Sequence, residues 1–412
     1  MRILKRLFLS VIFLSVAVSI SAQTTTTGGD GFDTKYGRMG INAISTAVPF
    51  ITLAPDARTG AMADVGASTS ADANSMHWNP AKYAFADKPI GVALNYTPWM
   101  RGIGVSDINL FNVAGYYKIN DKSAVAATLT YFSLGQVNFR GENNEDHGLV
   151  HPNEFAIDAT YSRKFSEKIS GAVAGRFIFS DLAQGVHSQA MAKAGTSVAA
   201  DIALYYVEPI KLGEMDAEFA LGVNISNLGS KMSYEVTKDK KEFIPANLKI
   251  GPSLKMNIDD YNSIFVGIDF NKLLVPTPPM YDPTYEYIAH GRTNEVDFFK
   301  GMIQSFYDAP GYVINPADEN GLPDTVKIGV FREELQEINI SIGAEWWYNK
   351  LLAVRAGYFF EHPRKGDRQF ITVGAGLRYN VFGLDLSYLI SLRRNSPLEN
   401  TLRVSLTLNF GS

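Results

Sequence analysis

The stretch that decides the fold is Thr401-Leu-Arg-Val-Ser-Leu-Thr-Leu-Asn-Phe410, which only Gly411 and Ser412 follow. Its even-numbered positions are all apolar and its odd-numbered positions are all polar. Successive side chains of a strand point to opposite faces, so this strand has one apolar face and one polar face. At the C-terminus of a chain with an export signal, the pattern predicts the closing strand of a transmembrane β-barrel, with lipid on one face and the lumen on the other.

The N-terminus has the pattern of that export signal. A positively charged start leads into an apolar run over 7–20 and a small-residue cleavage site before Gln23. The run is too short for a membrane helix with the right flanks. We therefore expect residues 1–22 to be a cleaved signal peptide, with an uncleaved anchor as the alternative.

The composition excludes several classes of protein. The 412 residues include no cysteine, which excludes disulfides, thiolate metal sites and a lipid anchor on cysteine. The formal charge of −4 and the lack of a basic stripe argue against nucleic acid as a partner. Nucleophile, phosphate-loop and zinc-protease motifs are lacking too. We expect a protein that is not an enzyme and that uses no cofactor or metal.

Period-two segments recur from residue 90 to the end of the chain, and fourteen can be counted. They cover 90–97, 107–118, 123–133, 153–163, 168–179, 196–206, 217–227, 246–256, 262–271, 336–346, 350–359, 369–379, 382–392 and 401–410. No later apolar run reaches about 18 residues, so no membrane helix is expected. The sequence predicts an all-β fold, a 14-stranded antiparallel transmembrane β-barrel over 89–412.

The connections between these segments alternate between short and long. The long ones are 134–152, 180–195, 228–245, 272–335, 360–368 and 393–400. Outer-membrane barrels have short periplasmic turns, long extracellular loops and aromatic girdles, which the tyrosines and tryptophans at the segment ends would form. We expect an outer-membrane protein with both termini in the periplasm.

The residues before the first strand differ in character from the barrel. Residues 23–47 begin with Thr- and Gly-rich sequence and are expected to be a flexible periplasmic leader. Residues 48–88 are rich in Ala, Gly and Ser, which can pack closely, and we expect them to form a hatch that plugs the lumen. A disordered tail is the alternative, but Phe50, Trp78 and Phe85 weigh against it.

The connection 272–335 is far longer than two strands need, and such loops are usually functional. Residues 299, 302, 303 and 306 share one helical face, which would leave an apolar surface outside the cell. We expect this loop to dock on a partner or cargo, and a self-packing lid over the barrel mouth is the alternative. The candidate docking residues are Leu273, Leu274, Phe298, Phe299, Met302, Ile303, Phe306 and Tyr307.

Charged residues also alternate into the predicted lumen. A pairing network that fixes hatch and wall is favoured over a polar conduit, because both signs occur in similar numbers. These residues are Asp158, Arg176, Asp201, Glu218, Asp269, Glu345, Arg355, Arg378, Asp385 and Arg403.

The stretches 57–67 and 72–81, which end in Asn79-Pro80-Ala81, resemble the N-terminal hatch of the fatty-acid-transporter-like (FadL-like) outer-membrane barrels. Within that superfamily the whole chain resembles the PorV family of the Bacteroidetes type IX secretion system. The Asn-Pro-Ala motif alone indicates the fold and not the function. Many relatives have Gly after this motif, whereas this chain has Lys82.

The resemblance implies a role and a set of partners. PorV-like proteins dock beside a large outer-membrane translocon barrel and bind secreted cargo proteins through the C-terminal signal domain of the cargo. They then deliver the cargo to a cell-surface sortase complex. The alternative function is a FadL-like transporter of fatty acids or other hydrophobic molecules, which would need an apolar pocket and a break in a wall strand. Pro98 is a candidate for that break, and the simpler interpretation is that it ends the first strand.

Overall fold

The computed structural model describes residues 41–411 except 141–145, 183–192, 235–240, 282–286, 318–322 and 394–395. The predicted signal peptide 1–22 and residues 23–40 of the predicted leader lie outside the described residues. None of the described helices is long and apolar enough to cross a membrane.

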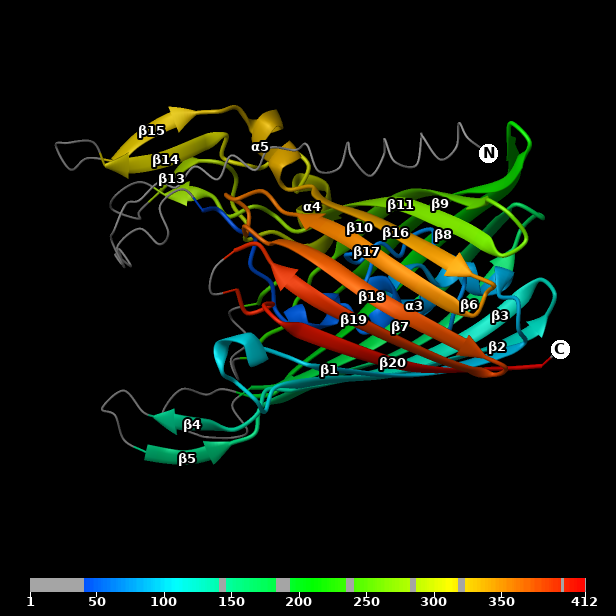
Figure 1. Ribbon diagram of the computed structural model, residues 1–412. Helices are drawn as coiled ribbons and strands as arrows, with labels where there is room; N and C mark the ends of the chain where they lie inside the picture. Colours follow the sequence, from blue (N-terminus) through cyan, green and yellow to red (C-terminus); the bar gives the residue numbers. More distant parts are fainter. Residues whose placement is uncertain are drawn as a thin grey trace. The chain divides into compact units, whose positions relative to one another are not determined.

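Within the described residues, fourteen antiparallel strands close into a barrel, as the sequence predicts (Figure 1). In order around the barrel they are β1 (Ile90–Pro98), β2 (Asn109–Asn120), β3 (Ser123–Ser133), β6 (Asn153–Lys164), β7 (Ile169–Asp181), β8 (Gly195–Leu212), β9 (Met215–Gly229), β10 (Asn247–Asn257), β11 (Asn262–Leu273), β16 (Asn339–Tyr348), β17 (Leu352–Phe360), β18 (Gln369–Tyr379), β19 (Phe382–Ser391) and β20 (Thr401–Phe410).

The last strand closes the barrel against the first. β20 pairs with β1 from Ile90 opposite Phe410 to Tyr96 opposite Val404. Its Leu402 and Leu406 are exposed on the outer wall, whereas Arg403 is buried on the lumen side. The alternation in the sequence therefore sorts the side chains between lipid and lumen, and closure leaves no free sheet edge.

The connections at one end of the barrel carry additional structure (Figure 1). This long-loop end has the short strands β4 (Val137–Arg140), β5 (Asp146–Val150), β12 (Met280–Tyr281), β13 (Ile288–His290), β14 (Tyr312–Ala317) and β15 (Pro323–Lys327), with the helices η3 (Arg101–Ile103), α4 (Phe298–Gln304) and α5 (Val330–Gln336). The predicted strand 336–346 begins three residues too early, because α5 continues to Gln336. Tight turns join the strands at the other, short-turn end.

The segment before β1 runs through the barrel from one end to the other. It contains η1 (Pro49–Thr52), α2 (Ala57–Gly60), α3 (Ser75–Trp78) and η2 (Pro80–Phe85). Its start lies at the long-loop end, where the Asn42 N–H donates to the Arg364 carbonyl (2.8 Å) and the Ala47 N–H donates to the Phe243 carbonyl (2.8 Å). The sequence analysis predicts a periplasmic leader up to residue 47, which would lie at the same end of the barrel as the C-terminus. Residues 41–47 lie at the other end, so the prediction is wrong for them.

Wall glycines let the hatch backbone approach the barrel very closely. A Cβ atom on Gly222 of β9 would lie 1.9 Å from the Ala67 carbonyl oxygen, and one on Gly357 of β17 would lie 2.3 Å from the Met62 carbonyl carbon. On Gly374 of β18 it would lie 2.4 Å from the Ala61 Cβ. Residues 61–67 thus occupy a groove that any larger wall residue would fill.

Candidate functional site

The Asn-Pro-Ala turn fixes the C-terminal part of the hatch to the wall. The Asn79 side chain accepts from the Ala81 N–H (3.0 Å), which caps η2, and Pro80 occupies the first position of that helix. The Asn79 amide also donates to the carbonyls of Ala67 (2.9 Å) and Leu204 (3.0 Å). The motif is therefore a structural anchor, because the Asn79 side chain uses its oxygen and both its N–H groups within the protein.

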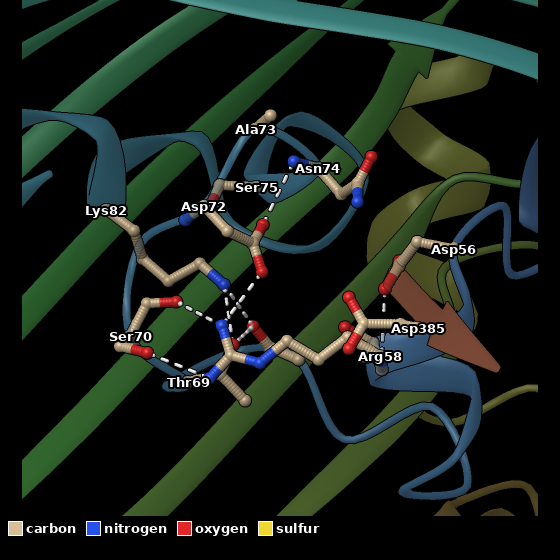
Figure 2. A network of polar contacts seen from close by, with 12 residues as sticks. Asp56, Arg58, Thr69, Ser70, Asp72, Ala73, Asn74, Ser75, Lys82 and Asp385 are labelled. Carbon is tan, nitrogen blue, oxygen red and sulfur yellow. Dashed lines mark hydrogen bonds and ion pairs between the residues drawn. The ribbon is translucent and has the colours of Figure 1, made fainter. Parts of the chain in front are cut away.

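Lys82, which directly follows the Asn-Pro-Ala motif, is a second anchor. Its side chain is 1% exposed, and its Nζ donates to the Gly66 carbonyl (2.8 Å) and to Thr69 Oγ1 (2.9 Å). Figure 2 shows Lys82 beside Thr69 within the same polar network as Arg58. Lys82 therefore ties the end of the hatch to its middle part, around Gly66 and Thr69.

Arg58 is the centre of the hatch network (Figure 2). Its guanidinium donates to the Ser70 carbonyl (3.3 Å) and Oγ (2.8 Å), to Asp72 Oδ2 (2.9 Å), and to both carboxylate oxygens of Glu345 on β16 (3.1 and 3.0 Å). An arginine has five N–H groups, so its hydrogen-bonding capacity is fully used. Arg58 thereby joins two parts of the hatch to the wall.

The wall continues this network around the lumen. Arg355 donates to Glu345 (2.6 Å) and to Asp385 (2.8 Å), and Arg378 donates to the other Asp385 oxygen (2.6 Å). Further around the barrel, Arg176 of β7 pairs with Asp158 of β6 and Asp201 of β8, and Lys249 of β10 lies 3.5 Å from Asp269 of β11. These pairs agree with the interpretation of the lumen charges as a structural network. Arg403 differs, since its Nε and Nη1 are buried without a hydrogen-bond partner among the described residues.

A cavity of about 340 Å³ lies on the long-loop side of the hatch. Charged and amide side chains line much of it, among them Asp64, Arg176, Asn224, Asn227, Asn247, Lys249, Asn271, Glu337, Asn339, Glu361, Lys365 and Arg368. Apolar residues such as Ile51 and Leu273 make up the rest. The cavity therefore combines polar and apolar surface.

The structure separates the eight candidate docking residues into two groups. Leu274 is only 3% exposed, Leu273 lines the cavity, and Phe298 packs against a buried cluster with Phe243. These three residues are less exposed than Phe299, Ile303, Phe306 and Tyr307, and their role in docking stays a prediction. The exposed group lies on and after α4: Phe299 (71% exposed), Ile303, Phe306 and Tyr307, with Met302 half-buried beside them.

The sequence analysis missed a second exposed apolar face, on α5. Phe331 is 77% exposed, and Val330 and Leu335 are exposed too, whereas Glu333 and Glu334 of the same helix are buried. This is the reverse of the usual arrangement, in which a surface helix turns its apolar side inward. We call the exposed residues of α4 and α5 together the rim face: Phe299, Ile303, Phe306, Tyr307, Val330, Phe331 and Leu335.

Buried ion pairs hold α5 in this orientation. Lys272, at the end of β11, donates to Glu334 (2.9 Å) and Glu337 (2.7 Å), and Lys365 donates to Glu333 (2.7 Å) and Glu337 (2.9 Å). Burial opposes the ionisation of Glu337, but Lys365 and Lys272 together hold its pKa below the ordinary value. The Lys272 Nζ also lies 5.8 Å from the ring centroid of Phe306, so the end of α4 and α5 are neighbours.

The buried carboxyl group of Asp308, in the same long loop, has a raised pKa, in contrast to Glu337. Asp308 accepts from the Thr277 N–H (3.2 Å) and the Gln304 amide (3.2 Å), and its Oδ1 has no hydrogen-bond partner in the described part of the chain. Burial raises the pKa of Asp308 to about 6 despite these two hydrogen bonds. The described residues contain no group of three His, Asp or Glu side chains placed to hold a metal ion.

A closed barrel with an apolar outer wall, a polar lumen and an internal hatch defines the chain as an outer-membrane β-barrel protein. Residues 37–280, more than half of the chain, match the family described as type IX secretion system protein PorV. The chain belongs to the PorV family, whose members are components of that secretion system. No curated protein sequence matches the chain.

Solved structures with a similar fold include two toluene transporters and a FadL homologue. The toluene transporter TbuX of Ralstonia pickettii is 11% identical over 86% of this chain and 98% of its own, with a TM-score of 0.44. The toluene transporter TodX of Pseudomonas putida is 13% identical over 85% and 95%, with a TM-score of 0.43. A FadL homologue of Pseudomonas aeruginosa is 12% identical over 90% and 100%, with a TM-score of 0.40. These values are too low to indicate a shared ligand.

Proposed function

We propose that this protein is a shuttle of the type IX secretion system, which accepts secreted cargo proteins at its rim face. It binds the C-terminal signal domain of the cargo as the cargo leaves a large translocon barrel, and it delivers the cargo to a sortase complex at the cell surface. The long-loop end is then extracellular and the short-turn end periplasmic. No step of this shuttle requires catalysis or a cofactor.

The observation that carries the proposal is the inverted helix α5. Glu333 and Glu334 of this helix are buried in ion pairs with Lys365 and Lys272. These pairs hold the helix so that Phe331 is exposed to water (77%). Removing one partner of a buried ion pair costs roughly 3–5 kcal/mol, so this orientation is strongly held. Exposed apolar patches of this kind mark contact surfaces, and aromatic side chains are frequent hot spots in protein interfaces.

The polar lumen does not favour the transporter alternative. A channel for hydrophobic molecules needs an apolar path from the loops past the hatch. The cavity instead contains Arg176, Lys249 and other charged groups, and the hatch below it is tied to the wall through Arg58 and Asn79. Pro98, the candidate break in a wall strand, is the last residue of β1 and ends the strand.

The test is a pull-down of tagged protein from its native membrane in mild detergent, with bound proteins and lipids identified by mass spectrometry. The variant carries Phe299→Ser, Phe306→Ser and Phe331→Ser. Phe165→Ser is the matched control, because Phe165 is also exposed (66%) but lies in a turn at the short-turn end.

The wild-type protein and the control are expected to retain a very large barrel or secreted proteins that share a C-terminal domain. The triple variant should lose them while its barrel remains folded. Unchanged capture by the folded triple variant would overturn the rim face as the docking surface. Stoichiometric fatty acid with no protein partner would overturn the shuttle in favour of the transporter.

A further inference from the structure

Four neighbouring strands place a row of polar side chains on one wall of the cavity. Asn224 of β9 is opposite Lys249 of β10, Lys249 is opposite Asn271 of β11, and Asn271 is opposite Asn339 of β16. All four residues line the cavity. Paired strands lie about 4.8 Å apart, so the row is about 14 Å long and is mounted on the rigid wall of a closed barrel.

Most of the amide groups of this wall are unused. Asn271 and Asn339, and Asn247 two residues from Lys249 on the same face of β10, form no side-chain hydrogen bond with any described residue. Asn224 donates to the Trp78 carbonyl (3.1 Å), but its Oδ1 is buried with no partner in the described structure. Each primary amide presents one acceptor oxygen and two N–H donors. The wall therefore offers donors and acceptors in alternation to a molecule in the cavity.

The cations that line the cavity are already paired with carboxylates, which disfavours an anionic ligand. Lys365 is paired with Glu333 and Glu337, and Arg368 forms a two-pronged pair with Glu361 (2.9 and 2.8 Å). Both cations are therefore neutralised by carboxylates and are poor partners for an anionic ligand. Arg176 and Lys249 are likewise paired, with Asp158, Asp201 and Asp269. The neutral amides are therefore the main free recognition groups, and the buried Asp64 Oδ1, which has no hydrogen-bond partner among the described residues, is a further acceptor.

The volume of the cavity and its apolar surface further limit which kind of molecule can fit. The volume of about 340 Å³ lies at the lower end of the range for small-molecule sites. Ile51, Pro245 and Leu273 supply apolar contacts beside the amides. A molecule that fits has hydroxyl groups, which both donate and accept, on a compact carbon frame.

We propose that this cavity is a binding site for a neutral, polyhydroxylated ligand of disaccharide size. The free amides of Asn247, Asn271 and Asn339 bond its hydroxyl groups, and the buried Oδ1 of Asn224 accepts from one of them. The site is distinct from the rim face, and it is occupied from the long-loop end, where the exposed residues Pro49, Thr52 and Gly366 line the cavity. The proposal does not depend on the shuttle function.

The test is isothermal titration calorimetry of the full-length protein with cellobiose and with maltose. An amine-oxide detergent is used, because a detergent with a sugar headgroup would compete. The variants are Asn271→Leu and Asn339→Leu, with Asn271→Ser and Asn339→Ser as a second pair that cannot overfill the cavity. Asn409→Leu is the matched control, since Asn409 lies opposite Gly91 near the short-turn end. Folding is checked by the heat-dependent gel mobility of barrels.

Saturable binding of at least one disaccharide is expected, about five- to tenfold weaker in each Asn271 and Asn339 variant and unchanged in the Asn409 control. The thermal midpoint should stay the same, because these amides stabilise nothing in the protein. No saturable binding of either sugar, or equal weakening in all variants, would overturn the site. Tighter binding of a neutral capped tetraglycine at the same amides would overturn the assignment to sugars.

Discussion

Replacement of Arg58 by alanine should release the hatch while leaving the barrel closed. In the wild-type protein Arg58 donates to Ser70, Asp72 and Glu345, so one side chain ties the hatch to itself and to β16. The substitution removes all these bonds at once. Asp72 then has no ion-pair partner in the described structure, whereas Glu345 keeps its contact with Arg355 (2.6 Å).

The cost of Arg58→Ala to the hatch depends on how many carboxylates lose their partner. Breaking a buried ion pair by removing one partner costs roughly 3–5 kcal/mol. The retained contact between Glu345 and Arg355 places Arg58→Ala near the lower value, about 3 kcal/mol, which corresponds to an increase of roughly 100-fold in the equilibrium constant for hatch opening. Arg58→Lys keeps the charge but loses the planar fork, so its effect should be smaller.

Hydrogen exchange with mass spectrometry in lipid vesicles measures this opening directly. Peptides from 57–82 should exchange faster in Arg58→Ala, whereas peptides from β16 to β20 should keep their protection. Arg101→Ala is the matched control, because Arg101 is an exposed arginine with no side-chain partner among the described residues. Equal protection of the hatch in wild type and Arg58→Ala would refute the reasoning that Arg58 holds it.

Three further predictions concern the fit of the hatch and the fixation of the loop. Gly222→Val should destabilise the protein by about 3 kcal/mol, because its Cβ would lie 1.9 Å from a hatch carbonyl, whereas Gly175→Val, with nothing within 4 Å of its Cβ, should be neutral in the same thermal unfolding assay. Asp308 has a folded pKa near 6, above the ordinary value of 3.8, so the stability that it gives the loop is full below about pH 4 and is lost as the pH rises through 6. Limited proteolysis should show a loop that is more resistant at pH 5 than at pH 7.5, and Asp308→Asn should remove that difference; the same difference in the variant would contradict the assignment. Lys272→Met should leave Glu334 without its lysine and increase cleavage within 287–317, and unchanged cleavage would show that Lys365 alone holds α5.

The barrel could be predicted from the sequence because its signal is local. Each strand must alternate between lipid and lumen, so the pattern is visible within ten residues, as in 401–410. The paired lumen charges could be anticipated for the same reason, since Glu345 and Arg355 are one turn apart in a hairpin. The Asn-Pro-Ala turn also has a local explanation, because Asn79 caps the helix that Pro80 begins.

The features that the sequence analysis missed depend on residues far apart in the chain. The inversion of α5 needs Lys272 and Lys365, which lie 62 and 32 residues from Glu334 and Glu333, respectively. Without these partners the glutamates of Val330–Gln336 are expected to face water. The end at which residues 41–47 lie depends likewise on backbone hydrogen bonds to Phe243 and Arg364, for which the leader sequence has no signal.

The hatch in the lumen and the helix α5 at the long-loop end are both held rigidly, which fits the proposed function at the rim better than transport through the lumen. A conducting barrel would need a hatch that moves at small cost, but wall glycines enclose residues 61–67 and every N–H of Arg58 is bonded inside the protein. The long-loop end has the reverse property, because ion pairs there hold an apolar helix face outward in water. A contact surface that is already held in its binding orientation loses little conformational entropy when a partner covers it. If the proposed function holds, the fixed hatch and the fixed α5 together give a rigid barrel that presents the rim face to a protein partner.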